Sequence, residues 1–133
     1  MPDKIAGIPM REPFKSEMDY FRKNPSVAGM ATEDNKVIIN PFTQISGQQK
    51  QAVAVNEAAR VWMRTKKDYA PDFTLTEQQE QFLNTTTYRN APASERLATI
   101  AARLLSNDTS AGVPTAGQNL FVARLKMAMF GSK

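Results

Sequence analysis

The residues of this sequence that come nearest to a catalytic group are Asn56, Glu57 and Arg60, which lie within one turn of a predicted helix. A glutamate on a helix can act as a general base when a metal ion or an activated water lies beside it. Glu57 and Arg60 are three residues apart, however, and opposite charges at this spacing pair on a helix surface with about 0.2–0.5 kcal/mol. We therefore interpret these residues as the solvated face of an amphipathic helix.

Two residue types that enzymes and metal sites use most are missing, because the sequence has no histidine and no cysteine. Without cysteine there are no disulfides, thiolate zinc sites or cysteine nucleophiles. Without histidine the commonest metal ligand and the commonest general base are missing. No glycine-rich phosphate loop or Gly-x-Ser-x-Gly motif is found either. We therefore predict a protein that is not an enzyme and that uses no cofactor or metal.

The strand-then-helix order around Glu57 resembles that of the zincin metallopeptidases. In that family a helix carries His-Glu-x-x-His, in which two imidazoles bind zinc and the glutamate is the general base. Asn56 and Arg60 occupy the two histidine positions, and only the glutamate is kept. Asparagine is a poor zinc ligand, and a permanently charged arginine repels the cation. The resemblance therefore implies an inactive zincin-like remnant and no activity.

Basic residues gather at the end of the same predicted helix, in a chain whose net charge is +4. Positive charge is favourable there because it faces the carbonyl end of the helix dipole. The same charges could bind phosphates, so a nucleic-acid-binding accessory protein is the alternative function. The cluster consists of Arg60, Arg64, Lys66 and Lys67.

The helix that must position these residues is predicted to run from Ser46 to Lys67. Ser46 and Gln49 form a capping box, in which each side chain accepts a hydrogen bond from the other residue's backbone N–H. Apolar residues follow at helical spacing, which predicts a buried stripe that includes the only tryptophan. The expected stripe consists of Ala52, Val55, Ala58, Ala59 and Trp62.

The rest of the chain also reads as mainly helical. Further helices are expected at 16–23, for about two turns after the capping box Thr76/Gln79, at 92–106, and at 116–130 after the capping box Thr115/Gln118. Two apolar runs, 27–32 and 37–40, flank a polar turn and indicate a β-hairpin, which should lie against the Ser46 helix. We predict a single α+β domain over residues 1–133, mainly helical, with four to five helices and one small β-hairpin.

Both ends of the chain carry more apolar residues than a solvated tail needs. Residues 1–14 contain three prolines and predict an extended arm that either packs on its own domain or lies in a groove of a neighbour. The last helix is apolar on nearly two faces, which is typical of a core or an interface. Its expected inner face is Leu120, Phe121, Leu125 and Ala128.

The stretch YFRKNPSVAGMATEDNKVIINPF, followed by NEAARVWMR, resembles small uncharacterised proteins encoded by tailed bacteriophages. The resemblance implies a virion-associated or host-takeover role. With no export signal and no apolar run near the length of a membrane span, we expect a location in the virion or the host cytoplasm and no membrane binding.

We therefore predict a non-enzymatic structural or protein-interaction component of a phage particle. Its partner would be another protein or a second copy of the chain, because the apolar residues at the chain ends need a surface to lie on. The predicted partner-binding residues are Ile5, Ile8, Met10, Met127, Met129 and Phe130.

Overall fold

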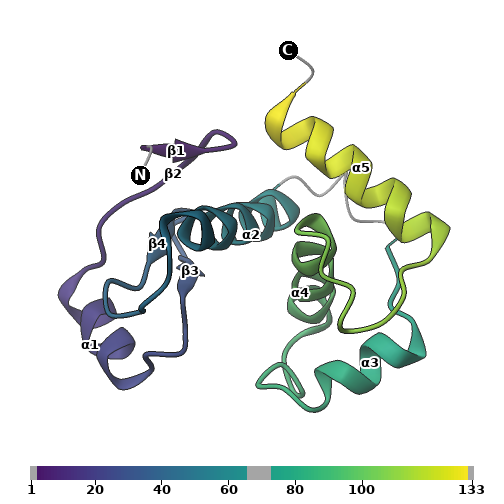
Figure 1. The fold of residues 1–133 in the computed structure, drawn as a ribbon, viewed down its shortest axis with the longest axis horizontal. Helices are drawn as coiled ribbons and strands as arrows, with labels where there is room; N and C mark the ends of the chain where they lie inside the picture. Colours follow the sequence, from purple (N-terminus) through teal and green to yellow (C-terminus); the bar gives the residue numbers. More distant parts are fainter. Residues whose placement is uncertain (1–2, 66–72, 132–133) are drawn as a thin grey trace. The chain divides into compact units, whose positions relative to one another are not determined.

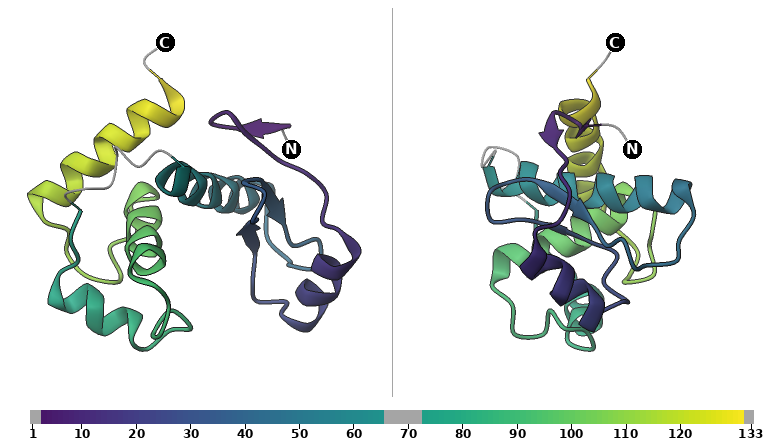
Figure 2. Two further views of the ribbon diagram at one scale, coloured as in Figure 1. Left: turned by 180° about the vertical axis from the view of Figure 1, so that it is seen from behind. Right: turned by 90° about the vertical axis from the view of Figure 1, so that its left-hand side faces the viewer.

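The computed structural model describes residues 3–65 and 73–131. In this part of the chain the backbone forms five helices and two antiparallel two-stranded sheets (Figure 1, Figure 2). This confirms the prediction of a mainly helical α+β fold. The chain divides into two compact units, Met1–Val61 and Trp62–Lys133. The single domain over residues 1–133 stays a prediction.

The first unit begins with a tight hairpin that the sequence analysis did not predict. Strand β1 (Lys4–Ile5) pairs antiparallel with β2 (Ile8–Pro9). The two turn residues, Ala6 and Gly7, have positive φ angles of 52° and 81°, as a type I′ turn requires at both central positions. Alanine is not a residue that signals such a turn, so the sequence indicated only extended backbone.

The second sheet matches the predicted hairpin. Strand β3 (Gly29–Ala31) pairs antiparallel with β4 (Val37–Ile39). Asn35 in the polar turn has a φ of 61°, a left-handed geometry that asparagine tolerates well. Met10 forms an isolated parallel bridge with Val37, so the N-terminal segment continues along β4.

Two helices follow in the first unit, and the second of them continues across the boundary into the second unit. Helix α1 (Lys15–Lys23) buries Phe21, and helix α2 (Gly47–Thr65) begins at the predicted capping box. The N–H of Gln49 donates to Ser46 Oγ at 3.1 Å, and the N–H of Ser46 donates to Gln49 Oε1 at 2.8 Å. Both predicted bonds of the box are therefore present.

The β3–β4 sheet packs directly on α2, and a glycine makes this possible. A Cβ atom built on Gly29 would lie 2.7 Å from Cγ1 of Val53 on α2 and 3.0 Å from the carbonyl oxygen of Ile38. Real Cβ atoms do not come so close, so only glycine allows this approach of backbone to helix. The expected contact between hairpin and helix is thus confirmed.

The buried face of α2 differs from the predicted stripe. Of the predicted stripe, Ala58 and Ala59 are buried as expected, whereas Val55 and Trp62 are only half-buried. Ala52 is exposed, so it was placed wrongly. The helix has alanine or valine on several sides, and apolar spacing alone then does not fix which side faces inward. The residues that are buried are Ala54, Ala58, Ala59, Val61 and Met63.

The second unit contains α3 (Glu77–Leu83), α4 (Ala93–Leu105) and α5 (Ala116–Phe130), all close to the predicted ranges. Helix α4 packs against α5 and contributes more buried apolar side chains than α3 or α5. Those of α4 are Ala98, Ile100, Ala101, Ala102, Leu104 and Leu105.

Two buried glutamines join the starts of α3 and α5. Each occupies the third helical position, N3, of a confirmed capping box, Gln79 with the N-cap residue Thr76 and Gln118 with the N-cap residue Thr115. Their side-chain amides also bond to each other: Nε2 of Gln79 donates to Oε1 of Gln118 at 2.9 Å, and Nε2 of Gln118 donates to Oε1 of Gln79 at 2.7 Å. Gln118 Nε2 donates as well to the carbonyl of Thr74 at 2.7 Å. One network therefore fixes both helix starts.

An arginine of α4 holds the loop that follows α3. Arg96 is buried and donates to the carbonyls of Tyr88 and Arg89 at 3.0 and 3.1 Å. Its guanidinium also donates to Glu80 Oε2 at 2.8 Å. These contacts give Arg96 a structural role in positioning the loop.

Candidate partner-binding site

Helix α5 uses one of its faces to build the core of the second unit. Gln118, Val122, Leu125 and Met129 are buried and follow one another at spacings of four, three and four residues, which places them on one side of the helix. Met129 is only 5% exposed. This residue, predicted to bind a partner, is therefore buried in the described structure.

The opposite face of α5 is also apolar, and it is exposed. Leu120 is 54%, Met127 58% and Phe130 44% exposed, and Ala123 is exposed between them. Spacings of three, four and three residues place these four side chains on one face, which we call the outer stripe. The expectation that Leu120 points inward is wrong, because α5 has two apolar faces and Leu120 lies on the other one.

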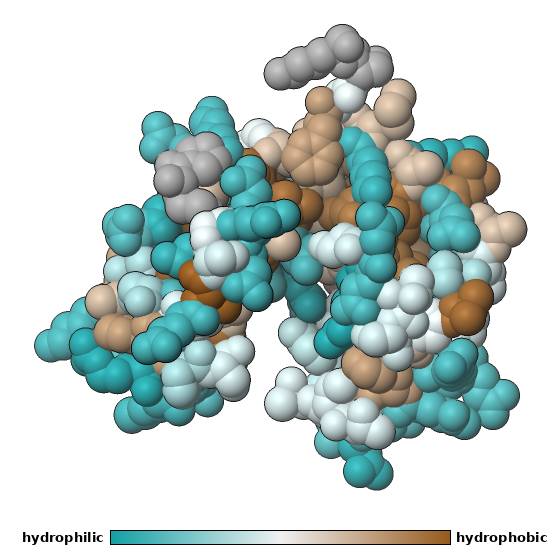
Figure 3. Space-filling model, in the orientation of Figure 1, coloured by the Kyte–Doolittle hydropathy of each residue, from teal (hydrophilic) through white to brown (hydrophobic). Residues whose placement is uncertain are grey.

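Positive charges border the outer stripe on both sides. Arg124 and Lys126 are exposed, and at 100° per residue they fall on opposite sides of the stripe. Helix α5 contains no aspartate or glutamate. In the space-filling view, hydrophilic and apolar side chains alternate over the region where Figure 1 shows α5 (Figure 3).

An open depression of about 500 Å³ lies against this part of α5. The residues that line it are Ala123, Arg124, Met127 and Ala128. Two members of the outer stripe therefore stand at the edge of a hollow that a side chain of another molecule could enter.

The N-terminal residues predicted to bind a partner lie in the first unit. Ile5 is 6% exposed, and Ile8 and Met10 are half-buried. The backbone of this segment is engaged as well, since Ile8 pairs with Ile5 and Met10 bridges to Val37. The described structure gives these three residues backbone pairing roles within their own unit.

The predicted pair between Glu57 and Arg60 is present. Arg60 Nε lies 3.5 Å from Glu57 Oε2, and the two side chains are 14% and 16% exposed. The interpretation of this face as solvated is therefore wrong, because the pair is mostly buried and Asn56 is half-buried. Of the other predicted phosphate contacts, Arg64 is exposed, while Lys66 and Lys67 lie outside the described residues. Among the described residues, no three His, Cys, Asp or Glu side chains gather as a metal site would need.

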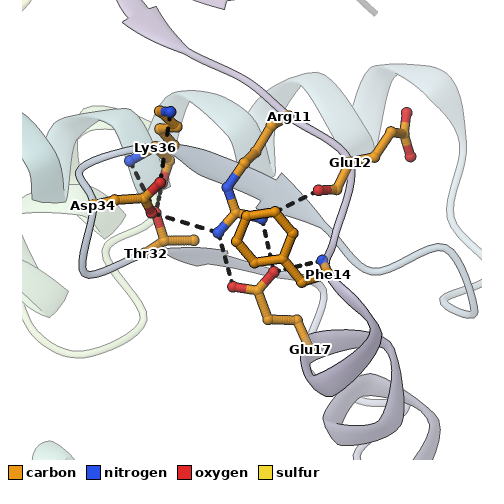
Figure 4. A network of polar contacts seen from close by, with 7 residues as sticks. All are labelled: Arg11, Glu12, Phe14, Glu17, Thr32, Asp34 and Lys36. Atoms are coloured by element: carbon orange, nitrogen blue, oxygen red, sulfur yellow. Dashed lines mark hydrogen bonds and ion pairs between the residues drawn. The ribbon is translucent and has the colours of Figure 1, made fainter.

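A network of charged groups surrounds Arg11 (Figure 4). Its guanidinium donates to both carboxylate oxygens of Glu17 at 2.7 and 2.9 Å and to Asp34 at 3.4 Å. It also lies 3.8 Å from the centre of the Phe14 ring, a cation–π geometry. These contacts tie the N-terminal segment to α1 and to the β3–β4 turn.

The same contacts shift the ionisation of the groups involved. The hydrogen bond to Glu17 raises the pKa of Arg11, and the hydrogen bonds from Arg11 lower the pKa of Glu17. The Thr32 hydroxyl and then Arg11 lower the pKa of Asp34 to about 2. Every charge in the network has an opposite partner, so we assign it to the stability of the fold.

No protein-family model, curated protein or solved structure matches this chain. No helix in the described part is long and apolar enough to cross a membrane. The candidate site therefore rests on the geometry of α5.

Sequence reasoning found Met127 and Phe130 but missed two members of the outer stripe. Leu120 was placed on the inner face, and Ala123 was not considered. The signal that could have found them is the pair of interleaved series in one helix, 118–122–125–129 and 120–123–127–130. Both series are apolar except at Gln118, and each has the spacing of a complete face.

Proposed function

We propose that the protein is a non-enzymatic protein-interaction component that binds a partner through the outer stripe of α5. The observation that supports this is the exposure of Leu120, Met127 and Phe130 along one face of a helix whose other face is already buried. A surface helix normally presents charged and polar residues to water. An apolar patch with a charged border is typical of a protein-binding surface, and methionine suits it because its side chain adapts to a partner.

The alternative functions have less support. For nucleic-acid binding, Arg60 is the first residue of the predicted cluster, and its guanidinium is paired with Glu57 in a mostly buried position. The same ion pair also disfavours a zincin-like metal site, because the positively charged Arg60 is paired with Glu57, the only carboxylate of the motif. The bacteriophage setting stays a prediction that rests on the resemblance of residues 20–42 and 56–64.

Photo-cross-linking in the cells that naturally produce the protein tests the proposal. A photoreactive amino acid replaces Met127 in the full-length chain, and the control carries it at Val113, which is 78% exposed and lies outside the outer stripe. We expect one defined protein to be cross-linked from position 127 and not from position 113. Adding Leu120→Asp should abolish this product. Equal products from both positions, or none from either, would contradict the proposed function.

A further inference from the structure

The outer stripe has the spacing of a coiled-coil seam. Leu120, Ala123, Met127 and Phe130 follow the pattern a, d, a, d of a heptad. In this register Arg124 occupies position e and Lys126 position g. Side chains at e and g flank the seam and select the partner helix by charge. The two positive residues of α5 thus stand where the charges of a docked helix would meet them.

The size and shape of the stripe also suit a helix. From Leu120 to Phe130 it is about 15 Å long, at a rise of 1.5 Å per residue. The small side chain of Ala123 lies between the larger side chains of Leu120 and Met127. Ala123 and Met127 also line the neighbouring depression. A side chain of a facing helix can enter such a hole between larger neighbours.

Charge argues against a second copy of α5 as the occupant. In an antiparallel pair, position e faces e and g faces g, so that Arg124 would meet Arg124 and Lys126 would meet Lys126. In a parallel pair, g faces the following e of the other helix, so that Asn119 would meet Arg124 and Lys126 would meet Gly131. Neither arrangement contains an attractive charge pair, because α5 has no acidic residue.

We infer that the outer stripe binds an amphipathic helix of a partner protein that carries aspartate or glutamate beside its apolar seam. This inference rests on the proposed function and names the chemistry of the partner. Acidic residues at the flanking positions pair with Arg124 and Lys126, while the apolar seam covers Leu120, Met127 and Phe130.

Two fluorescently labelled synthetic peptides of three heptads serve as probes. Both have leucine at every a and d position; one has glutamate at every e and g position, and the other has lysine there. Fluorescence anisotropy with the full-length protein at about 50 mM salt should show at least tenfold tighter binding of the glutamate peptide, a ratio that shrinks at about 300 mM salt. Met127→Asp should weaken binding of the glutamate peptide by at least about tenfold. The matched control Val113→Asp should leave it unchanged, and circular dichroism should show both variants folded.

A charge reversal separates recognition from general apolar adhesion. The double variant Arg124→Glu and Lys126→Glu changes two exposed side chains, so folding should be unaffected, and the preference should switch to the lysine peptide. Equal affinity for both peptides, or an unchanged preference in the reversed variant, would overturn the inference. The cross-linking from position 127 would survive that result, whereas its absence would remove the proposed function itself.

Two further outcomes would assign the stripe to a different occupant. Binding to vesicles of equal parts phosphatidylglycerol and phosphatidylcholine, without binding to the glutamate peptide, would assign it to an anionic lipid surface. A dimer seen by light scattering and abolished by Met127→Asp would assign it to a second copy of the chain. Either result would overturn the acidic-helix inference.

Discussion

Replacing Gln118 with alanine tests how the second unit is held together. Its Oε1 accepts from the N–H of Thr115 at 3.1 Å and from Gln79 Nε2 at 2.9 Å. Its Nε2 donates to Gln79 Oε1 and to the carbonyl of Thr74, both at 2.7 Å. Because Gln118 is 2% exposed, water cannot readily replace these partners. The substitution therefore removes both a capping hydrogen bond of α5 and the hydrogen bonds that connect α5 to α3.

The expected loss can be estimated from these four bonds. At a net contribution of about 0.5–1.5 kcal/mol each, they stabilise the fold by about 2–6 kcal/mol. The buried amide of Gln79, which is 0% exposed, would in addition lose two partners, at a cost of about 1–3 kcal/mol. These contributions overlap, so we expect Gln118→Ala to lower the free energy of unfolding by about 3–5 kcal/mol. Thr115→Ala removes only the cap hydroxyl and should cost about 1 kcal/mol.

Urea denaturation followed by circular dichroism measures both losses. A double variant sharpens the test. Gln79→Leu with Gln118→Leu removes both amides together, so no buried amide of the pair is left without its hydrogen-bond partner. We expect the double variant to lose about 1–2 kcal/mol less than the sum of the two single leucine variants. If Gln118→Ala cost no more than Thr115→Ala, the reciprocal amide pair would contribute little and the reasoning would be refuted.

Three further predictions concern the first unit. Each is measured as a change in the free energy of unfolding by urea denaturation. The folded state lowers the pKa of Asp34 to about 2 and also lowers that of Glu17; their stabilisation is therefore complete above about pH 4.5 and lost as the pH falls towards about 2. The decline should be shallower in Arg11→Met, and an identical decline would contradict the assignment. Gly29→Ala should lower the free energy of unfolding by about 1–3 kcal/mol, because its Cβ would lie 2.7 Å from a side chain of α2; unchanged stability would mean a looser contact. Gly47→Ala should raise it by about 0.4–1 kcal/mol, since nothing lies within 4 Å of the added Cβ, and a loss would show unseen strain.

The helices and their starts could be predicted because their signals are local. A capping box is defined by two residues three apart, and both of its hydrogen bonds form within one turn, whatever the rest of the chain does. The boxes at Ser46, Thr76 and Thr115 were for this reason found correctly. The β3–β4 hairpin was found in the same way, from a polar turn between two apolar runs.

The features that escaped prediction depend on contacts between distant residues. Gln79 and Gln118 are 39 positions apart, and nothing in either capping box shows that the two side chains meet. The network around Arg11 similarly requires the N-terminal segment, α1 and the β3–β4 turn to come together. The rotation of α2 was missed because alanine and valine occupy several of its sides, so that periodicity leaves the buried side open.

The rotation of α5 explains why an apolar surface remains exposed at all. The two faces of this helix are nearly equal in apolar content, with Val122, Leu125 and Met129 on one and Leu120, Met127 and Phe130 on the other, so burial alone hardly favours either. Gln118 decides which face is buried. It lies on the first face and reaches its hydrogen-bond partners only when that face is turned inward. Turning α5 by half a revolution would bury the outer stripe but would break this network, at the cost estimated above for Gln118→Ala. The hydrogen bonds of Gln118 that fix the rotation of the helix thus also leave the outer stripe exposed.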